Sequence, residues 1–228
     1  MNLLFDLGGT HFRYYILDSN TLINQKKYLR DNNILDQLYK CLNDIFLIYK
    51  IDNIKISIAG IVSNYQIYGC MNAGILNGTK LLKSINNIDI NYINDGDASL
   101  LGELYFNNLD FKNKNILNLI FGTGVGCGLM IHGKLINNSE IHKFIEPFMK
   151  KNYLTENNID LVTSFLSEEL SKFIELLNLD YIIINGYVKN YNNFKSNFIK
   201  KLNHNEYFKT NIIFSNCENP IYLGLLNY

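Results

Sequence analysis

Residues 121–130 read F-G-T-G-V-G-C-G-L-M and place a glycine at every second position between mostly apolar residues. A dinucleotide-binding fingerprint requires G-x-G-x-x-G at the opening of a helix, because the pyrophosphate binds at the helix N-terminus. Here the glycines alternate, and the residues that follow, L-M-I-H-G-K-L-I, have the pattern of an outgoing strand. A Walker loop is also excluded, since G-K-[ST] does not occur in the chain. The stretch therefore predicts a glycine hairpin between two strands.

This hairpin has two interpretations that the stretch alone leaves open. Because glycine lacks a Cβ atom, a phosphate can approach the backbone N–H groups closely, and Thr123 can add a hydroxyl donor. Gly122, Thr123 and Gly124 then form a phosphate-binding turn. The alternative is an ordinary tight turn, for which glycine is equally suited.

A second glycine turn near the N-terminus favours the first interpretation. Short apolar or alternating runs at residues 3–6 and 11–18 flank Gly8, Gly9 and Thr10. Asp6 stands directly before this turn, and a carboxylate beside a phosphate is a suitable ligand for magnesium, held directly or through water. The same strand, turn, strand unit thus occurs twice, about 115 residues apart.

Strands alternate with helices along the rest of the chain. Helices are predicted at residues 33–49, 98–106, 155–177, 188–202 and 220–227, and strands at residues 21–30, 54–59, 90–93, 115–121, 125–131, 134–137, 181–184 and 212–214. This alternation predicts an α/β architecture in two similar halves. We expect an N-terminal domain at residues 1–110 and a C-terminal domain at residues 111–228, with the last helix, residues 219–228, packing back on the N-terminal domain.

An acidic loop at residues 94–103, N-D-G-D-A-S-L-L-G-E, follows a predicted strand. Ligands of α/β sheets bind at the carboxyl ends of strands. Asp95 is placed there to accept a proton from a hydroxyl that attacks a γ-phosphate. The alternative is a helix-capping loop, because Asp is a favoured capping residue.

Bulk composition excludes several classes of partner. The 21 basic and 21 acidic side chains are scattered and cancel, so no footprint for nucleic acid or an anionic membrane is present and a small-molecule partner is expected. The uncharged residues 115–133 contain alternating glycines and predict a buried strand rather than a membrane helix. The four cysteines form no C-x-x-C pair, so neither a zinc site nor a disulfide framework is indicated. Because Asp6 stands where a signal peptide has its apolar centre, a cytoplasmic location is expected.

The three motifs D-L-G-G-T at residues 6–10, N-D-G-D-A-S-L-L-G-E at residues 94–103 and F-G-T-G-V-G-C-G-L at residues 121–129 resemble, in order and spacing, the ROK family of sugar kinases and sugar-responsive repressors. That family belongs to the actin-like ATPase superfamily. The resemblance implies two ribonuclease-H-like domains with a nucleotide and sugar cleft between them.

Roles follow from the resemblance by position. It makes Asp95 the catalytic base, Asp6 the magnesium-side carboxylate and the two glycine turns the phosphate hairpins. The segment I-I-I-N-G-Y-V at residues 182–188 resembles the adenosine segment with Gly186, and Asn185 stands where the family prefers glycine. The implied sugar ligands are Asn72, Asn94, Asp95, Glu140 and His142, although the prolines and tryptophan that the family has around the first of these are absent.

The sequence also departs from the family pattern. After the second hairpin the family usually has a G-E-I-G-H segment and a cysteine cluster that binds zinc, but here K-L-I-N-N-S-E-I-H-K-F follows, so zinc is not expected. Glu140 and His142 are either a shortened remnant of the sugar-binding pair or part of an exposed polar loop. His11 stands where lysine is frequent, and is either a phosphate contact or a surface strand histidine.

The expected activity is glucokinase-like: ATP- and magnesium-dependent phosphorylation of a hexose or N-acetylhexosamine hydroxyl. Two alternatives remain, a kinase of a non-sugar small molecule and a sugar- or nucleotide-binding regulator of the same fold with weakened catalysis. Family repressors carry a winged helix before the first hairpin, which here starts at residue 8, so direct DNA binding is not expected. Relatives commonly dimerise through the second domain, so a homodimer is compatible with the resemblance.

Overall fold

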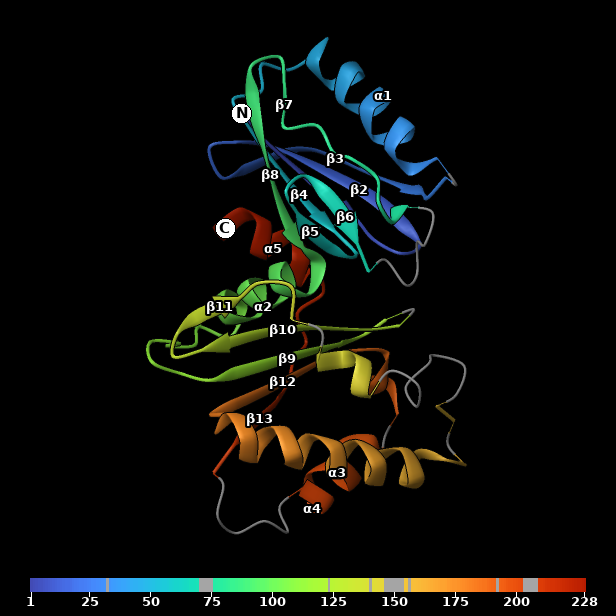
Figure 1. Ribbon diagram of the computed structural model, residues 1–228, viewed down its shortest axis with the longest axis vertical. Helices are drawn as coiled ribbons and strands as arrows, with labels where there is room; N and C mark the ends of the chain where they lie inside the picture. The colour runs from blue at the N-terminus through green and yellow to red at the C-terminus, as the bar shows by residue number, and fades with distance from the viewer. Residues whose placement is uncertain are drawn as a thin grey trace.

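Two mixed β-sheets, one above the other in Figure 1, are separated by a pair of helices. The computed structural model describes residues 1–31, 33–69, 76–122, 124–139, 141–145, 154–155, 157–191, 193–202 and 209–228. In this part of the chain, none of the helices combines the length and the apolar character that crossing a bilayer requires.

The first sheet has the strand order β3-β2-β1-β4-β8-β7. Its strands are the antiparallel meander β1 (Asn2–Leu7), β2 (His11–Asp18) and β3 (Thr21–Leu29), then β4 (Asn53–Ile58) and β8 (Ile88–Asn94), both parallel to β1, and the short β7 (Ser84–Ile85). Alternate residues Leu3, Phe5 and Leu7 point to one face, where they form a core with α1 (Ile34–Phe46).

The second sheet repeats this arrangement with the order β11-β10-β9-β12-β13. Its strands are β9 (Ile116–Phe121), β10 (Val125–Ile131), β11 (Lys134–Ile136), β12 (Tyr181–Gly186) and β13 (Asn211–Phe214). Again an antiparallel hairpin is joined by parallel strands, and α3 (Ile159–Leu177) and α4 (Phe194–Leu202) contribute to the core on the outer face. The predicted α/β architecture in two similar halves is confirmed.

Helices α2 (Asp95–Phe106) and α5 (Pro220–Asn227) cross in the middle layer at very short range. A Cβ atom on Gly102 would lie 1.8 Å from the carbonyl oxygen of Pro220, and one on Gly224 would lie 1.7 Å from that of Ala98. Glycine at both positions is therefore required for the helices to approach this closely.

The two middle helices face different sheets. Leu225 of α5 is fully buried in a cluster with Leu4 and Leu17 of the first sheet. Leu100 and Leu104 of α2 pack instead in a cluster that includes residues of the second sheet. The α2 and α5 pair thus connects the two lobes. The domain boundary between residues 110 and 111 stays a prediction.

Some predicted elements were wrong in extent. The hairpin β5 (Ile61–Ser63) and β6 (Gln66–Tyr68) and strand β7 were not predicted, because runs this short carry too little periodicity. The helix predicted at residues 188–202 is instead a 3₁₀ turn, η4 (Tyr187–Asn190), followed by α4, since Tyr191 between them is extended with φ −96° and ψ 115°.

Candidate active site

The first glycine turn connects β1 and β2 at the edge of the first lobe. The N–H of Gly8 donates to the carbonyl oxygen of His11 at 3.1 Å and closes the turn. A Cβ atom on Gly8 would lie 3.2 Å from that same oxygen, which is a tight contact. The predicted strand, turn, strand unit is confirmed, while phosphate binding by Gly8, Gly9 and Thr10 stays a prediction.

The second glycine turn connects β9 and β10, and its four glycines have different surroundings. The N–H of Gly122 donates to the carbonyl oxygen of Gly124 at 2.9 Å, whereas Thr123 lies outside the described residues. A Cβ atom on Gly126 would meet only the Ile120 side chain, at 3.6 Å. A Cβ atom on Gly128 would lie 2.5 Å from the carbonyl oxygen of Gly96. The last glycine thus lets β10 pack directly on the start of α2.

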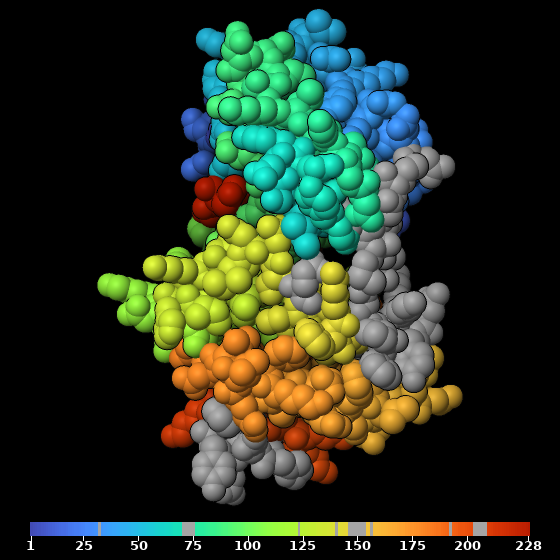
Figure 2. Space-filling view, in the orientation of Figure 1, coloured from blue at the N-terminus to red at the C-terminus, as the bar shows by residue number. Residues whose placement is uncertain are grey.

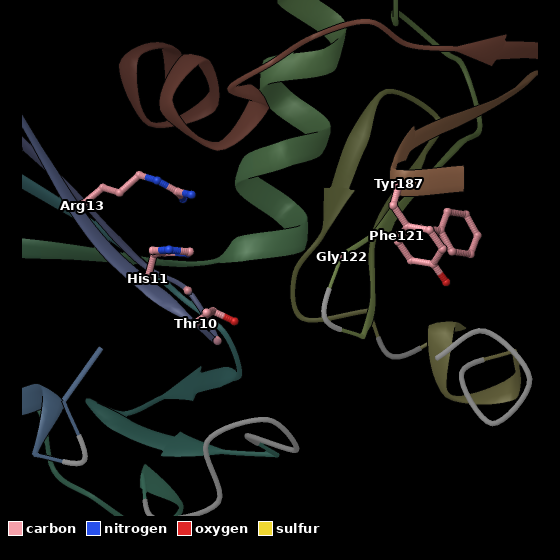
Figure 3. Close-up of a pocket in the computed structure, with 8 residues that line it drawn as sticks. Thr10, His11, Arg13, Phe121, Gly122 and Tyr187 are labelled. Atoms are coloured by element: carbon pink, nitrogen blue, oxygen red, sulfur yellow. The ribbon is translucent and has the colours of Figure 1, made fainter. Parts of the chain in front are cut away.

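Both turns line one cleft of about 350 Å³. Thr10, His11 and Arg13 come from the first lobe, and Phe121, Gly122 and Tyr187 face them from the second (Figure 3). The segment at residues 182–188 reaches the same cleft through Tyr187, because Gly186, with φ 101°, packs against the backbone of Phe121. A Cβ atom on Gly186 would lie only 2.0 Å from the Phe121 carbonyl oxygen, so this position accepts only glycine.

Asp6 is buried beside the first turn and is ion-paired. Arg13 Nη1 donates to Asp6 Oδ2 at 2.6 Å, and Ser57 Oγ donates to Oδ1 at 3.4 Å. Burial raises the pKa of Asp6, and Arg13 opposes that shift. Arg13 lies outside the three sequence motifs and was not predicted, although pairing in a tight hairpin places it directly opposite Asp6.

Asn94 and Asp95 stand where β8 runs into α2. Asn94 Oδ1 caps the helix by accepting from Gly96 N at 2.8 Å and Asp97 N at 3.2 Å, and its Nδ2 donates to the Gly60 carbonyl oxygen at 2.9 Å. Capping is therefore carried out by Asn94. The Asp95 carboxylate also accepts from Gly96 N, at 2.9 Å.

Asp95 has a strongly shifted titration. Burial, followed by the negative charge of nearby Asp6, raises the pKa of Asp95 to about 7. A carboxyl group with this pKa exchanges protons readily near neutral pH, as a general base requires. The charge interaction also shows that the acidic loop and the first glycine turn meet at one place.

The connection after β11 reaches the first lobe. Asn138 N donates to Asp97 Oδ2 at 2.7 Å, and Val62 N donates to Asn138 Oδ1 at 3.3 Å, so this segment bridges α2 and β5. Figure 2 shows this face, where the yellow segment after β10 abuts the cyan β5–β6 region. His142 lies on η2 (Ile141–Phe144), with its Nδ1 3.4 Å from Cys127 Sγ. Glu140 and Asn72 lie outside the described residues.

A second buried contact that the sequence did not indicate joins the lobes. Glu103 of α2 is fully buried, and its Oε1 accepts from Asn185 Nδ2 at 2.5 Å. The same Nδ2 donates to the Cys217 carbonyl oxygen at 3.0 Å. The family resemblance leads one to expect glycine at position 185. In this chain the Asn185 side chain instead donates to Glu103 and to the Cys217 carbonyl oxygen.

The described residues contain no cluster of the usual metal-ligating side chains. No group of three or more His, Cys, Asp or Glu side chains lies close enough together there to hold a metal ion by itself.

Comparison with known proteins gives a consistent result. The profile of the ROK family matches residues 3–140. An N-acetylmannosamine kinase from Yersinia pestis (strain Pestoides F) is 27% identical over 143 residues, which cover 59% of this chain and 48% of that protein. The chain thus spans about half the length of the curated relatives it matches.

Solved structures share the whole fold. The inorganic polyphosphate/ATP-glucomannokinase from Arthrobacter sp. strain KM has a TM-score of 0.76 at 17% identity, over 99% of this chain and 96% of that one. A ROK family glucokinase from Streptomyces griseus, in complex with glucose and AMPPNP, has a TM-score of 0.73 at 12% identity, over 99% and 98% of the two chains. At these identities the likeness concerns the fold alone.

Two α/β lobes, each with a glycine hairpin that lines a shared cleft, define the fold that this chain shares with these solved structures. The chain belongs to the ROK family.

Proposed function

We propose that this protein is an ATP-dependent kinase of a hexose or N-acetylhexosamine hydroxyl. The observation that carries the proposal is Asp95, a carboxylate with a pKa near 7 at the start of α2, close to the glycine turn that begins the cleft. The named activities of the relatives, phosphorylation of N-acetylmannosamine and of glucose, support a sugar acceptor.

Asp95 supplies the chemistry as a general base. Its carboxylate takes the proton from the acceptor hydroxyl while the hydroxyl oxygen forms a bond to the γ-phosphorus of ATP. The bond from that phosphorus to the β,γ-bridging oxygen breaks, and ADP leaves with the electron pair. Both glycine turns line the cleft, and we propose that their backbone N–H groups, other than those of Gly8 and Gly122 that close the turns, stabilise the phosphate oxygens.

A magnesium ion fits the residues present, with one restriction. Mg²⁺ is usually held by one or two carboxylates together with substrate phosphates, and Asp6 is the carboxylate beside the first turn. Because Arg13 already holds Asp6 Oδ2 at 2.6 Å, contact to the metal through water suits this arrangement. When bound, Mg²⁺ neutralises charge that develops on the β- and γ-phosphate oxygens.

The sugar would bind where α2, the strand end at Gly60 and the segment after β11 meet. Asn94 Nδ2 uses one N–H on the Gly60 carbonyl oxygen and retains a second for a sugar hydroxyl. Glu140, Asn72 and His142 are proposed ligands of the same site.

A panel assay tests this proposal. The purified protein is given ATP, Mg²⁺ and hexoses, N-acetylhexosamines or small organic acids in turn, and ADP release is measured. Sugar-dependent ADP release is expected. If only an acid stimulates turnover, the non-sugar kinase is correct instead.

A regulator without catalysis is the second candidate, and the short segment after β11 favours it. S-E-I-H follows where the family resemblance leads one to expect a longer glycine-rich loop. Calorimetry that finds tight sugar binding by a folded protein which releases no ADP would establish this candidate and exclude the kinase.

A further inference from the structure

Arg13 is the only permanently charged side chain among the described residues that line the cleft. Its side chain is 31% exposed, and in Figure 3 it extends from β2 toward Phe121 and Tyr187 on the opposite wall. Guanidinium carries five N–H donors in a planar fork, and the bond to Asp6 uses the Nη1 end. The bond to Asp6 holds the side chain in place, and the guanidinium has further N–H donors besides the one in this bond.

The rigidity of Arg13 comes from the hairpin. Asp6 and Arg13 are directly opposed residues of the antiparallel pair β1 and β2, so their side chains emerge on the same face of the sheet. The Asp6 side chain is 4% exposed, and Ser57 Oγ holds its second oxygen. The buried Asp6 carboxylate, which bonds to both Arg13 and Ser57, therefore orients the guanidinium group of Arg13.

A polyphosphate would bring further negative charge to this end of the cleft, where Arg13 already offsets the charge of Asp6. Asp6 and Asp95 place two acidic groups beside the turn that would receive polyphosphate. His11 is a weaker source of positive charge, because desolvation, Lys27 and Arg13 lower its pKa more than Asp6 raises it. Arg13 is the residue on this wall that can compensate phosphate oxygens, and its planar fork matches their geometry.

We propose that Arg13 binds the terminal phosphates of the nucleotide and that Asp6 acts largely as the residue that positions it. The inference rests on the proposed nucleotide-dependent function and names a phosphate ligand that the three sequence motifs do not contain. Because the contact joins guanidinium and phosphate directly, it persists when Mg²⁺ is removed.

Binding of AMPPNP, whose γ-phosphate is not readily transferred, tests the proposal. Calorimetry is run with AMPPNP and with adenosine, in Mg²⁺ and in EDTA, on the wild type, Arg13→Gln, Arg13→Lys and Asp6→Asn. Lys27→Gln is the matched control, because Lys27 is an exposed cation directly across from Arg13 on β3 and does not line the cleft. Thermal unfolding confirms that each variant is folded.

Arg13→Gln should weaken AMPPNP about ten- to a hundredfold in both Mg²⁺ and EDTA, as expected for a lost charge-assisted hydrogen bond. Adenosine affinity should be unchanged, Arg13→Lys should recover part of the loss, and Lys27→Gln should bind as the wild type does. In EDTA, where Asp6 has no metal to contact, the two losses in Asp6→Asn/Arg13→Gln should not add, because Asp6 acts through Arg13.

Three results would overturn the inference: Arg13→Gln binding AMPPNP as tightly as the wild type, an equal loss of adenosine affinity, or additive losses in the double variant in EDTA. These outcomes are separate from the proposed function. If the wild type phosphorylates no sugar, but Arg13→Gln binds AMPPNP more weakly than the wild type, the kinase proposal is wrong and the role of Arg13 as a phosphate ligand is supported. If the wild type phosphorylates a sugar, but Arg13→Gln binds AMPPNP as tightly as the wild type, the kinase proposal is supported and the role of Arg13 as a phosphate ligand is wrong.

Discussion

At the scale of single residues, adjacent side chains divide two tasks that the sequence left open. Asp95 had two interpretations, a helix cap and a catalytic base. The structure assigns the cap to Asn94, whose Oδ1 accepts from two N–H groups of the first turn. Asp95 is left in an acidic and partly desolvated position, and this environment raises its pKa.

The pH dependence of the reaction follows from that pKa. A general base must be ionised, so kcat/KM should rise with increasing pH through the Asp95 pKa of about 7 and level off above it. The acidic neighbour Asp6 contributes to the shift, so Asp6→Asn should move the acidic limb to lower pH, even though its rate also falls. Initial rates measured between about pH 5 and about pH 9 define this limb of the profile. A value of kcat/KM that stays constant down to about pH 5, well below the predicted limb, would contradict the role of Asp95 as general base.

At the scale of elements, the alternating glycines of the hairpin formed by β9 and β10 serve different purposes. The turn at Gly122 opens into the cleft, whereas Gly128 lies against the backbone of α2. The spacing of glycines indicated a hairpin but could not separate these roles, because the partner of Gly128 is Gly96, which lies in a different motif far away in the sequence.

Alanine at two of these glycines should therefore have different effects. Gly128→Ala should lower the free energy of unfolding by about 1–3 kcal/mol, because the new Cβ atom would lie 2.5 Å from the Gly96 carbonyl oxygen. Gly126→Ala is the matched control and should change it by less than about 1 kcal/mol, since its Cβ atom meets Ile120 at an ordinary 3.6 Å. Urea unfolding measures both, and equal losses would show that the contact with α2 is unimportant.

Local patterns predicted the two hairpins and the acidic loop because each motif is contiguous in sequence and has its own turn chemistry. Contacts between distant segments were not predictable in this way. The hydrogen bonds between Asn185 and Glu103 and between Asn138 and Asp97 join residues that are far apart in the sequence, so no local pattern indicates them. The break at Tyr191 was missed for a related reason, since the apolar spacing of residues 188–202 continues across it.

At the scale of the whole molecule, α5 connects the end of the chain to its beginning. After β13 of the second lobe, the chain returns to pack α5 on α2, β1 and β4 (Figure 1). Lys55 Nζ of β4 donates to the Leu225 carbonyl oxygen at 3.0 Å and adds a polar contact to this apolar packing. The position of one lobe relative to the other thus depends on the α2 and α5 pair.

Truncation in this layer should destabilise the protein. Leu225→Ala should lower the free energy of unfolding by about 2–5 kcal/mol, because the side chain is fully buried between helix and sheet. Leu176→Ala is the matched control, since that leucine of α3 is 77% exposed, and it should change stability by less than about 0.5 kcal/mol. Urea unfolding distinguishes them, and a loss of less than about 1 kcal/mol for Leu225→Ala would contradict the connecting role of α5.

The central claim, that Asp95 is the general base of a sugar kinase, is tested most directly by sugar phosphate formation in Asp95→Asn at saturating ATP and Mg²⁺. The account predicts a rate about 10²- to 10⁴-fold below that of the wild type. Asp89→Asn, an exposed change on the strand that leads to Asp95, should keep the full rate. Formation of sugar phosphate by Asp95→Asn at the wild-type rate would contradict the claim.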